Sequence, residues 1–509
     1  MTADSEGVDE ATPCVDPPCG ALRGRRDARR GVRAFLGIPY ASPPTGDARW
    51  RPPIPLAAWA GRRDATAFGP DCPQNSQTLT RAPRQSEDCL YLNVWSPVDA
   101  SPGTLPVMIW LHGGSFVGGS GSDERIDGQT LSARGVVLVT VNYRVGLFGF
   151  LAHPGLSAES PEGVSGNYGL LDQICALKWV RDNIQAFGGD PSRTSVFGVS
   201  AGSASISLLL ASPLSRGLFQ KAILQSPGAA RPLATLADAE RAGEAVGADV
   251  QALRRLDGAE VLRRTAFLTP KVRGLTTPRV LRPIRDGWVL PEDERPAFIG
   301  GRVHAMPILI GSNLDEGSML TAAWNVEDLA GFDALIHANF EDCVEQARSV
   351  YGARDASEVR TRVAEMFADT QFNYGTRLLA RAMADQGQDV WRYVFTRRRP
   401  GQVDGPHHGE EVAHVFGNLA VARRGSPARF DAVDEQLSDS MMRSWVAFAT
   451  TGNPNVDGLP AEWPAYAPGT DLHLVLGDRM QVGAGWRSAE LDFLESLFAR
   501  REPAPTESR

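Results

Sequence analysis

A serine at the apex of a predicted strand, turn and helix is the residue of this chain best placed for chemistry. Ser200 lies in the pentapeptide Gly-Val-Ser-Ala-Gly at 198–202, directly after the apolar run 194–197 and before a helix-like stretch over 203–211. Glycines two positions either side of a serine allow a sharp turn that exposes the hydroxyl at a sheet edge. The pattern predicts that Ser200 is a nucleophile for acyl transfer. Because short glycine patterns also arise by chance, its partners decide the interpretation.

An activated serine needs a base, and the base needs an acid that fixes its orientation. Glu316 follows a predicted strand over 307–310, and His408 lies in a loop beyond a predicted strand over 390–396. Both positions fall at the edge of the sheet where Ser200 is expected. Asp315 is an equally good candidate for the acid, and His407 competes with His408 for the base. The residues alone leave both choices open.

The elements that must position these residues alternate between short apolar strands and helices, as in a mainly parallel sheet covered on both faces. The clearest predicted strands span 107–111, 136–141, 194–197, 221–225, 307–310 and 390–396. A long helix is predicted over 168–187, where two glycines end it just before the strand that carries Ser200. The fold class is therefore α/β.

Length and composition indicate one large domain over residues 19–500, with a disordered tail at 1–18 and a flexible one at 501–509. Helical, charged and alanine-rich stretches around 236–300 and 321–386 are predicted as lid insertions over the carboxyl edge of the sheet. The net charge of −8 and the lack of a lysine or arginine block argue against a nucleic-acid partner. The abundance of arginine among the basic residues is interpreted as genomic composition. No secretory or membrane-spanning pattern is present, so we expect a cytoplasmic protein without a membrane partner.

Cysteine and histidine usage gives no sign of a metal or a disulfide scaffold. Six cysteines are too few for such a scaffold in 509 residues, although Cys72 and Cys89 flank one polar loop and could close it. The eight histidines show no ligand spacing beyond the adjacent pair His407 and His408, which cannot easily converge on one ion. His112 opens a glycine loop at 112–116 and is expected to pack rather than transfer protons. We expect neither metal nor cofactor.

Several motifs in order resemble the type B carboxylesterase family, which includes bacterial p-nitrobenzyl-type esterases and the cholinesterases. They lie at 35–41 (Phe-Leu-Gly-Ile-Pro-Tyr-Ala), 87–94 (Glu-Asp-Cys-Leu-Tyr-Leu-Asn-Val), 112–116, 167–173 (Asn-Tyr-Gly-Leu-Leu-Asp-Gln), 187–191 and 445–455. The resemblance implies an α/β-hydrolase fold, with a large central sheet flanked by helices. It also implies that Glu316, in an Asp-Glu-Gly turn, is the acid. The base would be His408, nine residues ahead of the glycine of Val-Phe-Gly.

By the same resemblance, the backbone N–H groups of Gly114, Ser115 and Ala201 would form an oxyanion hole. Phe116 ends the same loop and is expected at the pocket. Ser115 stands where the family has a third glycine, so its side chain is expected to crowd the acyl side. Ser226 matches a family serine near the triad, and we expect it to support the triad from behind.

Two departures from the family bear on the substrate. Val199 replaces an acidic or polar residue before the nucleophile, and no aromatic residue lies between Cys72 and Cys89, where cholinesterases carry a tryptophan that binds ammonium groups. We therefore expect a serine carboxylesterase, a monomer or weak homo-oligomer, that hydrolyses neutral esters of short to medium acyl chain rather than choline esters. Two alternatives stay open. One is a carbamate or amide hydrolase with the same triad, and the other is a non-catalytic interaction protein on this fold.

Overall fold

The computed structural model describes residues 12–75, 80–269, 274–421 and 429–501. Within these residues, eleven strands form one large sheet in the order β14-β13-β12-β11-β10-β9-β7-β8-β6-β4-β3. Neighbouring strands from β13 to β8 run parallel, and the pairs at both edges run antiparallel. The strands are β3 (Arg25–Asp27), β4 (Val32–Pro39), β6 (Tyr91–Pro97), β7 (Leu105–Leu111), β8 (Val137–Val141), β9 (Gly189–Val199), β10 (Lys221–Gln225), β11 (Ile308–Asn313), β12 (Val390–Phe395), β13 (Leu472–Leu476) and β14 (Met480–Ala484).

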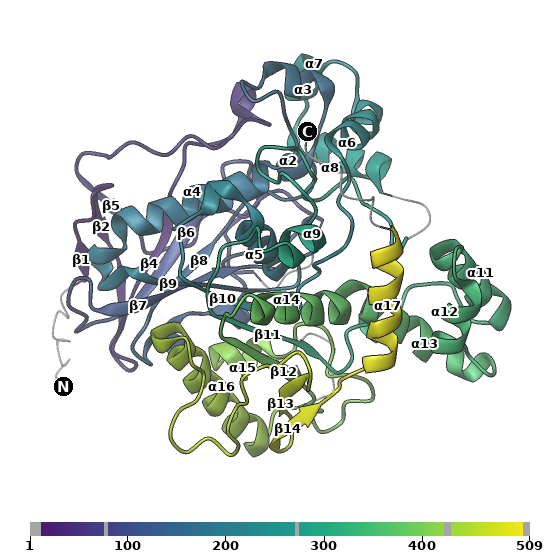
Figure 1. Ribbon diagram of the computed structural model, residues 1–509. Coiled ribbons are helices and arrows are strands. Elements are labelled where there is room, and N and C mark those ends of the chain that lie inside the picture. The colour runs from purple at the N-terminus through teal and green to yellow at the C-terminus, as the bar shows by residue number, and fades with distance from the viewer. Residues whose placement is uncertain (1–11, 76–79, 270–273, 422–428, 502–509) are drawn as a thin grey trace, which may run out of the picture.

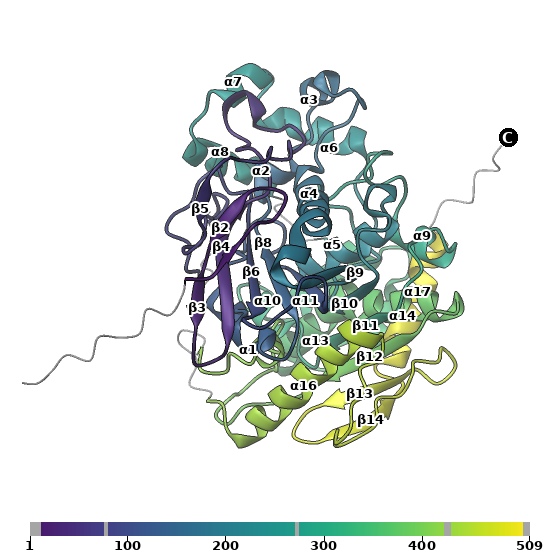
Figure 2. The same ribbon diagram turned by 90° about the vertical axis from the view of Figure 1, so that its left-hand side faces the viewer.

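The central strands are apolar on both faces because helices cover both faces of the sheet. In β7, Val107 and Ile109 belong to one hydrophobic core, while Met108 and Trp110 belong to the other. The first core contains α4 (Tyr168–Asn183) and α5 (Ala201–Ala211), and the second contains α16 (Ala432–Thr451). Figures 1 and 2 show α4 and α5 on one side of the sheet and α16 on the other. The predicted α/β-hydrolase architecture is thus confirmed.

The helix predicted over 168–187 is split in the structure. α4 ends at Asn183, and a 3-10 turn over Ile184–Phe187 follows. Gly188 then adopts φ 100°, a left-handed conformation that closes the turn and that glycine tolerates without strain. The chain enters β9 at the next residue, so this turn fixes where the strand that leads to Ser200 begins.

The remaining helices lie mostly in the two predicted insertions. They are α1 (Gln129–Ser132), α2 (Gly146–Phe150), α3 (Pro154–Glu159), α6 (Leu236–Gly243), α7 (Val250–Arg254), α8 (Gly258–Arg264), α9 (Glu294–Ile299), α10 (Ser318–Thr321), α11 (Leu329–Phe340), α12 (Val344–Tyr351), α13 (Ala356–Ala368), α14 (Tyr374–Asp385), α15 (Val412–Phe416) and α17 (Ser488–Arg501). α11, α12 and α13 project from one side of the molecule, and α17 runs between them and the sheet (Figure 1).

Part of the second predicted insertion belongs to the sheet layer instead. α14 packs against β11 and β12 and connects these two parallel strands. A parallel pair needs such a crossover helix, so this segment is part of the framework and not of the lid.

The predicted disordered tail at 1–18 is wrong for residues 12–18. In this stretch β1 (Cys14–Val15) pairs with β2 (Ala21–Arg23), which pairs with β5 (Arg62–Asp64) in a small second sheet. At the other end Arg501 is the last residue of α17, bound to Asp342. Residues 1–11 and 502–509 lie outside the described part of the chain. None of the described helices has the length and apolar character needed to cross a bilayer.

Candidate active site

Ser200 forms the tight turn between β9 and α5. Its φ of 58° and ψ of −123° are strained for a residue with a side chain. The flanking glycines make the turn possible, because a Cβ at Gly198 or Gly202 would lie 2.5 or 2.0 Å from the Leu111 carbonyl oxygen. The backbone N–H of Ser200 donates to the Gln225 carbonyl at 3.0 Å and fixes the turn to β10.

Glu316 and His408 form a largely buried pair in the loops that follow β11 and β12. His408 Nδ1 contacts Glu316 Oε2, and Glu316 is 1% exposed. Its second oxygen, Oε1, accepts hydrogen bonds from the Asn313 backbone N–H and from Ser226 Oγ, both at 2.6 Å. Since Glu316 Oε2 meets the ring nitrogen, the carboxylate fixes the orientation of the imidazole.

The opposite nitrogen of the same ring has no partner in the described part of the chain, and the ring belongs to a residue that lines a cavity. His408 Nε2 is buried and, among the described residues, has no hydrogen-bond partner. His408 and Ser200 line the same cavity, and Phe372 packs on the His408 ring at a centroid distance of 4.3 Å. No hydrogen bond joins Ser200 to His408 in the described residues, which is common in unliganded hydrolases because this bond tightens with substrate.

His407 and Asp315 form a second pair, one position earlier in each loop. His407 Nδ1 lies 3.6 Å from Asp315 Oδ2, and both side chains are about one-fifth exposed, at 19% and 20%. Asp315 also accepts from the backbone N–H groups of Ser318 at 2.9 Å and Gly405 at 3.0 Å. These contacts hold two loops together, and His407 does not line the cavity. The two candidates left open by the sequence therefore have different surroundings.

The glycine loop after β7 presents its backbone to the cavity. Gly114, Ser115 and Phe116 have successive φ values of 123°, 57° and 63°. In the described residues the N–H groups of Gly114, Ser115 and Ala201 donate to no protein acceptor. Three unused donors around one serine are what an oxyanion hole requires.

His112 anchors the start of that loop. It is buried, stacks on Tyr143 at a centroid distance of 4.2 Å, and donates from Nδ1 to the Gly113 carbonyl at 2.9 Å. Burial lowers the pKa of His112 to about 4, so the ring is neutral at pH 7. Its place in the structure is that of a packing residue.

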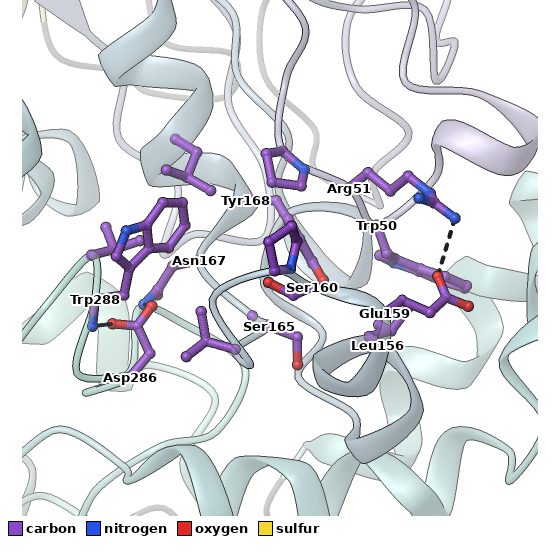
Figure 3. Close-up of a pocket in the computed structure, with 16 residues that line it drawn as sticks. Trp50, Arg51, Leu156, Glu159, Ser160, Ser165, Asn167, Tyr168, Asp286 and Trp288 are labelled. Atoms are coloured by element: carbon purple, nitrogen blue, oxygen red, sulfur yellow. Dashed lines mark hydrogen bonds and ion pairs between the residues drawn. The ribbon is translucent and has the colours of Figure 1, made fainter.

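The cavity at Ser200 has a volume of about 720 Å³, within the range of small-molecule sites. Both insertions contribute to its wall, the first through Leu262, Thr265 and Leu268 and the second through Phe367 and Phe372. A second cavity beside Trp50, Tyr168 and Trp288 has about 80 Å³ (Figure 3). It shares no lining residue with the first and is too small for a drug-sized ester.

Residues that the sequence did not single out complete the surroundings of the triad. Glu411 is fully buried and accepts from Gln225 Nε2 at 3.0 Å and Asn313 Nδ2 at 2.7 Å. Burial raises the pKa of its carboxyl group. Two glutamates follow Gly409, and sequence alone does not say which is buried, since Glu410 pairs with Arg399 at 3.0 Å instead.

A π-helical turn, Asp369–Asn373, joins α13 to α14. Such a turn holds one residue more than an α-helical turn. Asp369 is anchored by Arg487 through two contacts of 2.6 and 2.7 Å. The turn places Gln371 and Phe372 on the wall of the cavity, where Phe372 meets His408. The sequence pattern predicted only helix in this stretch and did not predict the turn.

The other predicted residues also lie at or near the site. Val199 and Phe116 line the cavity, and Ser115 is exposed within it. Cys72 and Cys89 are buried free thiols that contact each other, so their predicted bridge stays a prediction.

The chain is similar to known proteins over most of its length. The model of the "Carboxylesterase family" matches residues 11–494. The chain belongs to the carboxylesterase family. Its relatives include the fumonisin B1 esterase of Sphingopyxis macrogoltabida, 46% identical over 92% of this chain and 86% of that protein. The para-nitrobenzyl esterase of Bacillus subtilis (strain 168) is 37% identical over 91% of this chain and 94% of that protein.

Solved structures agree with this membership. A PNB esterase structure superposes with a TM-score of 0.83 and 34% identity, covering 94% of this chain and 99% of the other. A thermophilic PNB esterase gives a TM-score of 0.84 over 94% and 100% of the two chains, also at 34% identity. With a carboxylesterase family match and esterase relatives over nearly the whole chain, the protein is a carboxylic ester hydrolase.

Proposed function

We propose that this carboxylesterase works through an acyl-enzyme on Ser200. His408 takes the Ser200 proton as the hydroxyl attacks the ester carbonyl, and then gives that proton to the leaving alcohol. Water activated by the same histidine attacks the acyl-enzyme, releases the acid and restores Ser200. Glu316 orients the ring and stabilises its charged form. The observation that carries the proposal is the His408–Glu316 pair, in which the imidazole keeps an Nε2 that is unpaired among the described residues, and His408 lines the same cavity as Ser200.

The tetrahedral intermediate would be stabilised by the N–H groups of Gly114, Ser115 and Ala201. Their positive-φ loop and helix terminus fix the donors before substrate binds, which avoids reorganisation during the reaction. Because all three donors are backbone groups, the replacement of a family glycine by Ser115 leaves the hole itself in place.

The test is covalent labelling of the nucleophile. A fluorophosphonate should label the wild-type protein once, and peptide mass spectrometry should place the label on Ser200. Ser200→Ala should lose both labelling and hydrolysis of p-nitrophenyl butyrate while keeping its circular dichroism spectrum and melting temperature.

Ser203→Ala is the matched control. Ser203 is fully buried in α5, and its Oγ has no partner among the described residues. This variant should label and hydrolyse like the wild type. A label on another residue, or full activity in Ser200→Ala, would contradict the proposed mechanism.

A further inference from the structure

Three arginines converge on the wall of the Ser200 cavity. Arg231 follows β10, and Arg279 and Arg282 come from the first insertion. Their guanidinium groups share two neutral acceptors. The Gln371 side-chain oxygen meets Arg231 Nη1 and lies 3.4 Å from Arg279 Nη2, and the Gly228 carbonyl lies 3.4 Å from Arg231 Nη2 and 3.5 Å from Arg282 Nη2.

Two arginines of this cluster have guanidinium groups that are only partly hydrogen-bonded. Arg231 and Arg282 form no ion pair with a carboxylate among the described residues, and the Nε of each is buried without a partner. Elsewhere Arg144, also buried, meets Asp172 through Nε at 2.8 Å and Nη2 at 2.7 Å. Burial, together with the charges of neighbouring arginines, lowers the pKa of Arg231 and brings that of Arg282 to about 10.

The acid whose charge acts on both Arg231 and Arg282 is Glu294. Glu294 accepts hydrogen bonds from Ser207 Oγ and from the Ala230 backbone N–H at 3.0 Å, and it does not line the cavity. Burial raises the pKa of Glu294 to about 7, so its charge is only partial at neutral pH.

Like charges held together in a partly buried wall are costly unless an anion joins them. The planar guanidinium fork binds a carboxylate through two parallel hydrogen bonds. The cluster also approaches the glycine loop, because the Arg282 guanidinium lies 5.3 Å from the ring centroid of Phe116, in the loop that carries two of the proposed oxyanion donors.

We propose that the preferred substrates are esters that carry a free carboxylate, which the cluster of Arg231, Arg279 and Arg282 binds. This inference rests on the proposed acyl-enzyme function and replaces the sequence-based expectation of neutral esters. The carboxylate resides on the acyl or on the alcohol part of the ester, and matched substrates separate these two cases.

The experiment compares kcat/KM within isosteric pairs that differ only in charge. For the acyl side the pair is mono-4-nitrophenyl adipate and the corresponding adipamate. For the alcohol side it is 4-(butyryloxy)benzoate and 4-(butyryloxy)benzamide. The wild-type enzyme should prefer the charged member of one pair by at least about tenfold, or roughly 1.4 kcal/mol.

The double variant Arg231→Gln/Arg282→Gln should reduce that preference, the ratio of kcat/KM within the pair, at least about tenfold. Arg285→Gln is the matched control. Arg285 lies on the same segment, pairs with Asp293 at 3.6 Å and does not line the cavity. This variant should keep the wild-type preference.

Three outcomes are informative. Preference for a charged ester that disappears only in the double variant supports the inference. Equal rates within both pairs, or a preference that survives in the double variant, overturn it and leave the proposed serine mechanism intact. If the wild type hydrolyses none of the four esters, or is not labelled at Ser200, the proposed function itself is overturned.

Discussion

Two histidine–carboxylate pairs occupy neighbouring positions on the same two loops, and only one of the two histidines lines the cavity at Ser200. His408 and Glu316 are nearly sealed from solvent, with side chains 9% and 0% exposed, and His408 lines the cavity with an Nε2 that no described residue pairs. His407 and Asp315 are more exposed, and their remaining hydrogen bonds go to loop backbone. Each carboxylate has its own serine, Ser226 for Glu316 and Ser318 for Asp315. Residue type alone therefore does not separate the two pairs; their burial and their place relative to the cavity do.

The largest difference between the pairs should appear in turnover. His408→Ala and Glu316→Ala should each lower kcat about 1000-fold or more, because they remove the base or its orientation. His407→Ala and Asp315→Ala should lower it less than about tenfold, since neither residue faces the cavity. Steady-state kinetics on p-nitrophenyl butyrate measures all four. Equal losses of kcat in the two histidine variants, or in the two carboxylate variants, would contradict the assignment of the catalytic pair.

Folding stability, unlike turnover, should depend on Asp315. Burial opposes ionisation there, but hydrogen bonds from His407 and Ser318 lower the pKa of Asp315 to about 2. Asp315→Asn weakens these bonds and should cost about 1–3 kcal/mol of folding free energy, measured by urea unfolding at pH 7.

The pH dependence follows from the sign of that pKa shift. A lowered folded-state pKa stabilises the protein above the unfolded value of about 3.9, and this stabilisation is lost as the pH falls toward 2. The difference in melting temperature between wild type and Asp315→Asn should therefore narrow between pH 6 and pH 3. A constant difference across this range would show that the ionised carboxylate is not responsible.

The two serines give a smaller and sharper contrast. Ser226→Ala removes one of the donors that fix Glu316 and should lower kcat about tenfold with little change in KM. Ser318→Ala removes the equivalent donor from Asp315 and should leave kcat unchanged. Similar kcat values in both variants would mean that Ser226 only fills space.

The smallest effect concerns the apolar wall beside the catalytic pair. Val199 Cγ2 lies 3.8 Å from the position that a Cβ at Gly409 would take, next to His408. Choline esters should have a kcat/KM at least about tenfold below p-nitrophenyl butyrate, because an ammonium group loses water here without gaining a partner. Val199→Glu should narrow that ratio by a few fold. A ratio unchanged in the variant would remove Val199 from the explanation of specificity.

The sequence predicted what depends on local pattern. The apolar runs predicted the central strands and the glycine spacing predicted the turn at Ser200, because both patterns reflect local backbone geometry. The choice between His407 and His408 needed the family resemblance, since adjacent histidines in a loop have no periodicity. The arginine cluster was missed because Arg231, Arg279 and Arg282 come together only in the folded chain, and a general abundance of arginine concealed them.

The π-helical turn over Asp369–Asn373 has an evolutionary consequence. One segment carries both Phe372, which packs on His408, and Gln371, which binds Arg231 and Arg279. A π-helical turn differs from a regular α-helix by one inserted residue. Deletion of a single codon within this turn would restore regular winding and rotate both side chains off the cavity wall. One such deletion would therefore change both the contact with His408 and the contact with the arginines. Insertions and deletions within this turn should accordingly be rarer among relatives than in the neighbouring helices.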